Sequence, residues 1–216
     1  MTSIINHWIN GELQPSTSER YGDVFNPATG EVSASVSMGN SDDLNKAVEA
    51  ASEAFETWSQ TSVTKRAQIF FKYKELLESN REELIDLITA EHGKVAADAA
   101  GSLQRGIEVV DFVCGIPHLL KGEFSEQVGT GIDCYSTRQP IGVCSGVTPF
   151  NFPAMVPMWM FPIAIACGNT FILKPSEKDP SCAMKLAELL QEAGLPKGVL
   201  NVLNGDKEIV DAILDH

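Results

Sequence analysis

The sequence predicts an α/β fold in which N-terminal helices accompany a partial parallel β-sheet and a β-hairpin projects from the body. Three observations support this prediction. Apolar residues recur at helical spacing between positions 41 and 120. Residues 121–139 are polar, contain glycine and partly alternate, which is typical of a hairpin. From Pro140 onward strand and helix patterns alternate, which favours parallel strands with helices on both faces.

The N-terminal part is expected to begin with strands and then to become helical. Residues 4–12 and 20–38 have short β patterns, with a turn signal at Asn26-Pro27-Ala28-Thr29-Gly30. Ser41 is expected to cap the first helix, because two aspartates follow it in the first turn. The apolar face of this helix would carry Leu44, Val48, Ala51, Phe55 and Trp58.

Further helices are expected before residue 121. One covers about residues 64–77, and Asn80 with Glu83 resembles a capping box for the next helix, which would end at Gly93. The last helix covers about residues 95–120 and is punctuated by glycines and a proline. The apolar face of the helix at 64–77 would carry Ala67, Phe70, Phe71, Lys74 and Leu77.

The C-terminal part is expected to repeat strand and helix units. Asp179 and Pro180 would begin one of its helices, as a cap followed by a first-turn proline. About three parallel strands are predicted, fewer than the roughly five or six of a doubly wound sheet, so we expect the sequence to be part of a larger protein. The predicted strands are 141–147, 170–173 and 199–203, and the predicted helices are 152–167, 181–193 and 206–214.

Composition and charge exclude several classes of function. The formal net charge of −13 repels phosphate backbones, and no basic patch is present, so no nucleic-acid partner is expected. The cysteines include no C-x-x-C pair and the histidines are scattered, so no metal site is expected. The longest apolar run, residues 152–167, is too short and too rich in proline for a membrane span. Residues 1–10 lack a signal-peptide pattern, and we expect a cytoplasmic protein.

Two loops follow the first two strands of the predicted parallel sheet, where open α/β sheets bind their ligands. The first loop is Thr148-Pro149-Phe150-Asn151, and the second is Lys174-Pro175-Ser176-Glu177-Lys178. Glu177 can accept hydrogen bonds from the ribose hydroxyls of an adenosine, and Lys174 can donate to the same ribose. The carboxylate would repel a 2′-phosphate, which favours NAD over NADP. The alternative is a solvated polar loop without a ligand.

Asn151 lies at the junction between the first predicted strand and its helix, where a side-chain amide offers a preorganised N–H donor. Such donors stabilise a developing oxyanion, by roughly 3–4 kcal/mol when measured by removal. The alternative is that Asn151 is the N-cap of the helix that follows. From this position alone the N-cap interpretation is favoured.

Several motifs together resemble the aldehyde dehydrogenase superfamily, and they follow one another along the whole chain. They are N-P-A-T-G-E-V (26–32), E-H-G-K (91–94), T-P-F-N-F-P (148–153), G-N-T-F-I-L-K-P-S-E (168–177) and A-G-L-P-K-G-V-L-N-V (193–202). Within the superfamily the sequence is most similar to the CoA-acylating, methylmalonate-semialdehyde dehydrogenase branch, through residues 104–108, 148–157 and 159–162. His92, where the family more often has asparagine, is a small departure.

The resemblance implies the N-terminal portion of the aldehyde dehydrogenase fold, with a partial Rossmann-like sheet and without the catalytic domain. Residues 1–120 would be the N-terminal strands and helices of the NAD-binding domain. Residues 121–139 would be an oligomerisation hairpin, and residues 140–216 the first βα units of the NAD-binding sheet. The intact protein would be a homo-oligomer, either a dimer or a tetramer.

The resemblance also implies a chemistry. In this family a cysteine thiolate attacks the aldehyde and hydride passes to NAD, and in this branch the thioester is released to coenzyme A. Asn151 would help to hold the oxyanion, while Thr148 and Phe150 would line the NAD site through backbone groups. The adenosine ribose and its surroundings would be held by Lys174, Glu177 and Lys178.

Arg105 is the candidate for substrate recognition in this resemblance. Malonic and methylmalonic semialdehydes carry a free carboxylate, and the planar guanidinium of arginine is its natural partner. The alternative is an ordinary surface arginine on a helix.

The family's nucleophilic cysteine lies in the second half of a much longer chain, and none of the five cysteines here matches its context. We therefore expect residues 1–216 alone to lack dehydrogenase activity. A stand-alone nucleotide-binding module and an oligomerisation remnant are the alternatives.

Overall fold

The main sheet has five strands in the order β3-β2-β10-β9-β8 in the computed structural model, which describes residues 3–216. The last three of these strands are parallel, as predicted, and the first two are antiparallel additions at the β10 edge. Strand β9, which lies between β10 and β8, is buried at every position, in agreement with its apolar residues Phe171, Ile172 and Leu173. The strands are β2 (His7–Ile9), β3 (Glu12–Gln14), β8 (Val143–Val147), β9 (Thr170–Lys174) and β10 (Leu200–Val202).

The antiparallel addition corrects the prediction of one strand over residues 4–12. The chain leaves β1 (Ser3–Ile5) at Asn6 and turns sharply at Asn10 and Gly11, which both have positive φ angles, of 52° and 73°. This is the pattern of a two-residue hairpin turn. The turn is held against β10 by the Asn10 N–H, which donates to Asn201 Oδ1 at 2.9 Å.

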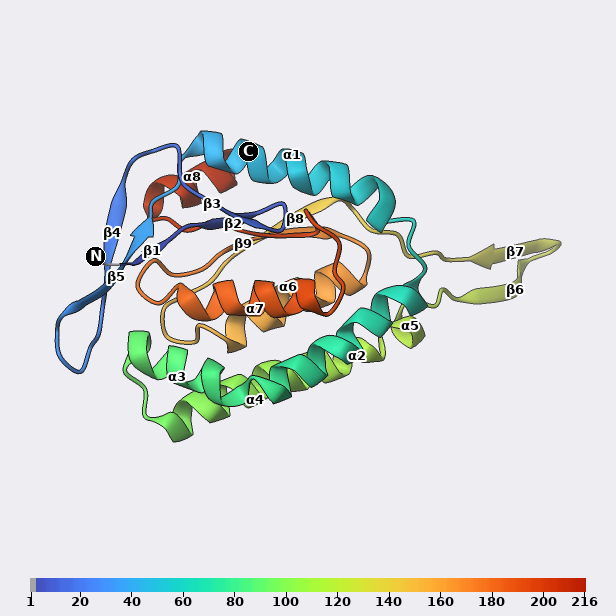
Figure 1. Ribbon diagram of the computed structural model, residues 1–216. Coiled ribbons are helices and arrows are strands. Elements are labelled where there is room, and N and C mark those ends of the chain that lie inside the picture. The colour runs from blue at the N-terminus through green and yellow to red at the C-terminus, as the bar shows by residue number, and fades with distance from the viewer. Residues whose placement is uncertain (1–2) are drawn as a thin grey trace.

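A second, small sheet has the order β1-β5-β4. Its strands β4 (Tyr21–Phe25) and β5 (Val32–Ser37) pair antiparallel, and β1 pairs parallel with β5. The predicted turn between β4 and β5 is confirmed, since the N–H of Gly30 donates to the carbonyl of Asn26 at 2.8 Å. This sheet lies at the end of the molecule that is remote from the projecting hairpin (Figure 1).

Helices cover both faces of the main sheet, which confirms the predicted α/β fold (Figure 1). One face is covered by α1 (Ser41–Trp58) and α8 (Lys207–Asp215), and the other by α6 (Met155–Ala166) and α7 (Ser181–Glu192). A third layer packs on α6 and α7 from outside. It consists of α2 (Val63–Ser79), α3 (Arg81–His92), α4 (Ala96–Cys114) and the short α5 (Ile116–Leu119).

Several helix caps differ from the sequence prediction. Asn40, not Ser41, caps α1, and it forms a capping box with Asp43. Asn80 is the N-cap residue of α3, as predicted, but it forms no capping box, and its side-chain amide donates instead to the carbonyl of Leu76 in the preceding helix. Gly93 ends α3 in the left-handed conformation at φ 84°, as predicted.

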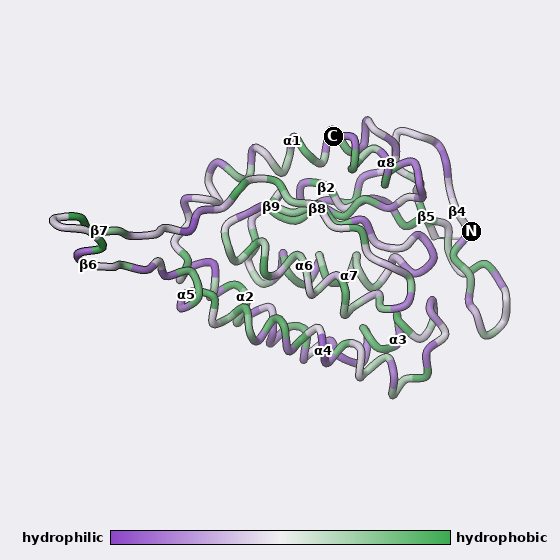
Figure 2. The backbone as a smooth tube through the Cα atoms, turned by 180° about the vertical axis from the view of Figure 1, so that it is seen from behind, coloured by the Kyte–Doolittle hydropathy of each residue, from purple (hydrophilic) through white to green (hydrophobic). Residues whose placement is uncertain are grey.

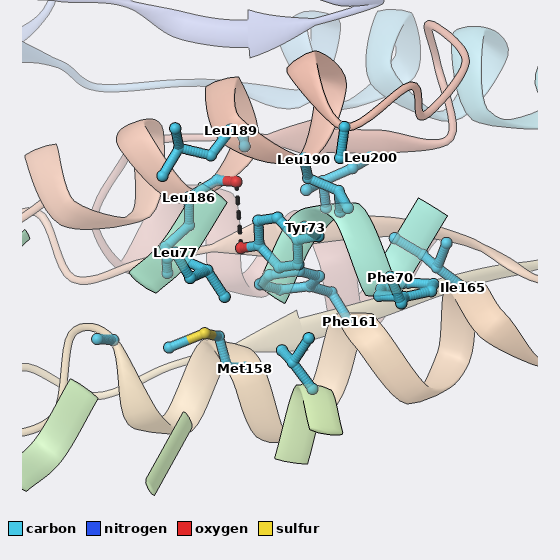
Figure 3. Packing of buried hydrophobic residues seen from close by; sticks show 14 of the residues in the cluster. Phe70, Tyr73, Leu77, Met158, Phe161, Ile165, Leu186, Leu189, Leu190 and Leu200 are labelled. Carbon is cyan, nitrogen blue, oxygen red and sulfur yellow. Dashed lines mark hydrogen bonds between the residues drawn. The ribbon is translucent and has the colours of Figure 1, made fainter. Parts of the chain in front are cut away.

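The hydrophobic core lies between α6, α7 and the outer helices (Figure 3). Phe161 and Tyr73 are buried side by side, with ring centroids 6.4 Å apart. The Tyr73 hydroxyl donates to the Leu186 carbonyl at 3.2 Å, so its polar atom is satisfied inside the core. Phe71, which was expected on the buried face of its helix, is 56% exposed, because that face is centred on Phe70 and Tyr73.

The predicted hairpin projects from the body as β6 (Phe124–Gly129) and β7 (Ile132–Tyr135) (Figure 1). Figure 2 shows apolar residues near its tip. Four large apolar side chains on the hairpin are more than half exposed, namely Phe124, Val128, Ile132 and Tyr135. The division of the chain at residues 120 and 139 remains a prediction.

The apolar run that contains α6 is a buried helix with Pro162 in its interior. Within residues 3–216 no helix is both long and apolar enough to cross a membrane.

Strand β8 forms one edge of the main sheet, where Val143 and Val147 are partly exposed. The two edge strands of the main sheet are therefore β3, from the N-terminal part, and β8.

Candidate functional site

The two predicted ligand loops lie next to each other at the carboxyl ends of β8 and β9. The backbone N–H of Thr148 donates to the carbonyl of Lys174 at 3.0 Å, which continues the parallel pairing of the strands by one step. Thr148 is buried by this arrangement, while Phe150 and Asn151 extend into the exposed turn that follows. The parallel sheet thus brings residues 148–151 and 174–178 to a single edge.

Lys174 and Glu177 form an ion pair inside the second loop. The Nζ atom of Lys174 lies 3.2 Å from Oε2 of Glu177, and the side chains are 6% and 32% exposed. An ammonium so deeply buried requires a partner, which the carboxylate supplies. Because Glu177 remains one-third exposed, its carboxylate can accept further hydrogen bonds from a ligand.

A cavity of about 440 Å³ adjoins these loops. Phe150, Glu177 and Lys178 form one wall of it, and Glu91 also lines it. The opposite wall comes from the small sheet and its turn, which sequence reasoning did not connect with the site. That wall consists of Gly22, Asp23, Phe25, Pro27 and Met38.

Asn151 is exposed, and its side-chain amide makes no hydrogen bond to the described residues 3–216. The N-cap of α6 is Ala154, three positions further along the chain, and it has no side-chain capping bond. The alternative interpretation of Asn151 as an N-cap is therefore wrong. Its amide is left as an accessible donor beside the carboxyl end of β8.

The segment Glu91-His92-Gly93-Lys94 reaches the site from the end of α3. The His92 ring stacks on the Phe150 ring, with centroids 4.5 Å apart and an interplanar angle of 13°. The Lys94 ammonium donates to the backbone carbonyl of Asn151. The sequence did not predict these contacts, because E-H-G-K was interpreted only as a helix end and a family motif.

Buried acids lie beneath the second loop. Burial raises the pKa of Asp179 to about 8, and the neighbouring Glu91 carboxylate adds to this shift. Neither carboxylate oxygen of Asp179 has a hydrogen-bond partner within residues 3–216. Asp179 therefore does not cap α7 as predicted. Instead, Glu91 accepts hydrogen bonds from the N–H and hydroxyl of Ser181, at 3.0 and 2.5 Å.

The environments of four cysteines do not favour a thiolate. Burial raises the pKa of the thiols of Cys114, Cys144, Cys167 and Cys182. A reactive cysteine requires a lowered pKa. Among the described residues, no group of three or more histidine, cysteine, aspartate or glutamate side chains is arranged to hold a metal ion.

Arg105 lies on α4 and is exposed to solvent. Its side chain forms no ion pair within residues 3–216. The next residue, Gly106, is the contact point with α6, because a Cβ atom there would lie 2.1 Å from Met158 Cε. Arg105 therefore lies next to the residue at which α4 packs on α6. Its role in substrate recognition remains a prediction.

Comparison with known proteins shows close relatives. A malonate-semialdehyde dehydrogenase of Pseudomonas aeruginosa is 56% identical over 210 residues, which are 97% of this chain and 42% of that protein. Malonate-semialdehyde dehydrogenase 2 of Bacillus cereus is 54% identical over 213 residues, 99% of this chain and 44% of that protein. The chain thus spans less than half the length of the curated relatives it matches.

Solved structures agree with these matches. Methylmalonate-semialdehyde dehydrogenase from Oceanimonas doudoroffii superposes with a TM-score of 0.96 at 56% identity, covering 100% of this chain and 44% of that one. A homologue from Sinorhizobium meliloti 1021, solved in complex with NAD, gives a TM-score of 0.98 at 55% identity with the same coverage. A model of the aldehyde dehydrogenase family matches residues 13–216. As its motifs predict, the chain belongs to the aldehyde dehydrogenase family.

Proposed function

We propose that this chain forms the cofactor-binding and oxyanion-donor part of an NAD-dependent dehydrogenase that oxidises malonate or methylmalonate semialdehyde. The observation that carries the proposal is the Lys174–Glu177 pair beside the Asn151 turn, at the carboxyl edge of the parallel sheet. Relatives that share more than half of its residues are malonate-semialdehyde dehydrogenases, which supports this substrate class.

The residues of the two loops fit the adenosine end of NAD. Lys174 offers an ammonium donor and Glu177 a partly exposed carboxylate acceptor, which together match a pair of ribose hydroxyls. Thr148 and Phe150 would line the site through their backbone, and Lys178 would close its rim. When bound, NAD supplies the hydride acceptor of the reaction. The part of the chain that would face the aldehyde is the Asn151 amide.

Glu177→Gln is expected to weaken NAD binding by about tenfold, because a charged acceptor is replaced by a neutral one. The same change is expected to reduce the preference for NAD over NADP, since the charge no longer repels the 2′-phosphate. Calorimetric titration of the 216-residue chain with both cofactors measures the two effects.

The matched control is Glu188→Gln, which also removes a carboxylate paired with a lysine, but on α7 and outside the two ligand loops. Its NAD affinity is expected to stay unchanged. Equal NAD affinity in the Glu177→Gln variant and the wild type would refute the ribose-binding role. If the wild-type chain does not bind NAD, the proposed cofactor site fails as a whole.

Arg105 is proposed to bind the carboxylate of the semialdehyde. In an intact homologue, Arg105→Leu at the matching position is expected to lower kcat/KM for the semialdehyde by at least about tenfold. Turnover of an uncharged aldehyde of similar size should change far less. Equal losses on both substrates would contradict the role.

The remaining parts of the proposal concern the whole protein. Coenzyme A would accept the acyl group from a cysteine thioester, and residues 1–216 alone would not turn over. The exposed apolar residues of the β6–β7 hairpin support an oligomerisation role for the hairpin, and sedimentation of the chain tests this role.

Steady NAD reduction by the purified chain would contradict the prediction that residues 1–216 alone are inactive. A cytoplasmic location is proposed as well.

A further inference from the structure

We infer that Glu91, His92 and Lys94 are positioning residues that hold the two ligand loops in fixed relation to each other. The inference rests on the proposed function only in assigning those loops to NAD and the oxyanion. The contacts of Glu91, His92 and Lys94 that support it are observed in the structure. The segment 91–94 reaches both loops from a third direction, the end of α3, and none of its side chains is needed to end that helix.

Glu91 fixes the second loop from below. Its carboxylate accepts hydrogen bonds from the N–H of Ser181 at 3.0 Å and from the Ser181 hydroxyl at 2.5 Å. Ser181 is the first residue of α7, so a carboxylate from another helix caps it and interacts favourably with its N-terminus. Because only Asp179 and Pro180 separate residues 174–178 from α7, this contact anchors the chain just after the loop that carries Glu177.

His92 fixes the first loop from the side. Its ring lies 4.5 Å from the Phe150 ring in a nearly parallel stack. Burial lowers the pKa of His92, and the nearby Lys94 charge lowers it further, so the stacked ring is the neutral imidazole at pH 7. Phe150 also lines the cavity beside Glu177 and Lys178, and its ring orientation therefore shapes the wall of the site.

Lys94 fixes the turn that carries the oxyanion donor. Its ammonium donates to the backbone carbonyl of Asn151 and lies 4.1 Å from the centroid of the Phe152 ring. A charge-assisted hydrogen bond and a cation–π contact act on consecutive residues. Gly93 makes the arrangement possible, because its φ of 84° reverses the chain and a Cβ atom there would lie 2.8 Å from Pro27.

The three contacts have one consequence for the site. The Asn151 turn and the loop that carries Glu177 belong to different βα units, and segment 91–94 is bonded to the turn and to Ser181, which begins the helix after the loop. It thereby sets the distance between the oxyanion donor and the ribose-binding carboxylate without lining the reacting centre. Removing one of these contacts should loosen the loop that it holds while the rest of the core stays intact.

The experiment compares three variants of the 216-residue chain by hydrogen-exchange mass spectrometry and NAD titration. Lys94→Met keeps the side-chain length but removes the charge and the donor. Lys94→Arg keeps both the charge and the donor, and it tests whether they are sufficient to restore the wild-type exchange and NAD affinity. Lys72→Met is the matched control, because Lys72 also donates to a backbone carbonyl, that of Glu192 at 3.0 Å, but far from the ligand loops.

Lys94→Met is expected to raise amide exchange in peptides covering residues 148–154 by about tenfold and to weaken NAD binding by several fold. Lys94→Arg should restore most of both quantities, and Lys72→Met should change neither. Unchanged exchange at 148–154 in Lys94→Met would overturn the inference, as would a loss of protection spread over the whole chain. Absence of NAD binding in the wild type would refute the proposed function alone, since the exchange measurement needs no ligand.

Discussion

Phe161→Ala is expected to lower the free energy of unfolding by about 3–5 kcal/mol, because it removes a fully buried ring from the core. Phe161 lies on α6, where it contacts Tyr73 of α2 within the main core cluster (Figure 3). Removing the ring leaves a cavity between two helices whose packing is fixed by their other side chains. Chemical denaturation of the variant and the wild type, followed by circular dichroism, measures the difference.

Phe71→Ala is the matched control, because it removes the same ring from an exposed position of the neighbouring helix. It is expected to change the unfolding free energy by less than about 1 kcal/mol. Similar losses in the two variants would mean that the assignment of the buried face of α2 and α6 is wrong.

Asp179→Asn is expected to stabilise the protein at alkaline pH by at least about 2 kcal/mol more than at pH 5. Asp179 is 2% exposed and has no hydrogen-bond partner for its carboxylate oxygens among residues 3–216. Burial raises its pKa from 3.8 to about 8, so the folded protein holds the proton that the unfolded chain loses. The unfolded state binds fewer protons, and wild-type stability therefore falls as the pH rises between these two values.

The asparagine variant carries no such proton and should escape this loss. Urea unfolding of both proteins at pH 5, 7 and 9 tests the prediction, with Asp86→Asn as an exposed control on α3. A stability difference that does not vary with pH would show that Asp179 is not a buried acid. The result also bears on the site, because Asp179 follows the loop that carries Glu177.

Local patterns in the sequence predict most of the fold. Hydrophobic periodicity locates the helices to within a few residues, and the alternation after Pro140 predicts the parallel strands correctly. Predictions failed where a remote partner decides the outcome. Asp179 precedes a helix in the usual capping position, but Glu91, which lies 90 positions before Ser181, makes the capping bonds instead. Nothing near Asp179 in the sequence indicates that competitor.

In the candidate site, too, the sequence predicts local features but not the contacts made by remote residues. The loops after β8 and β9 could be placed together, because parallel strands end at one edge of a sheet. Their clamp by His92 and Lys94 could not be derived from spacing, since α3 belongs to a different layer of the fold. The motif E-H-G-K was visible in the sequence, but only the left-handed turn at Gly93 explains how its side chains reach both loops.

The addition of β2 to the β10 edge has a consequence for how the chain is made. Trp8 pairs with Val202, and the N–H of Asn204 donates to His7 Nδ1 across 197 positions of sequence. Strands β2 and β3 cannot enter the main sheet until β10, which lies far along the chain, has been synthesised. Such distant contacts slow folding, because the entropy of closing a long loop must be overcome first. Until β10 is available, β2 lacks its partner in the main sheet, and its unpaired edge is open to association with other chains.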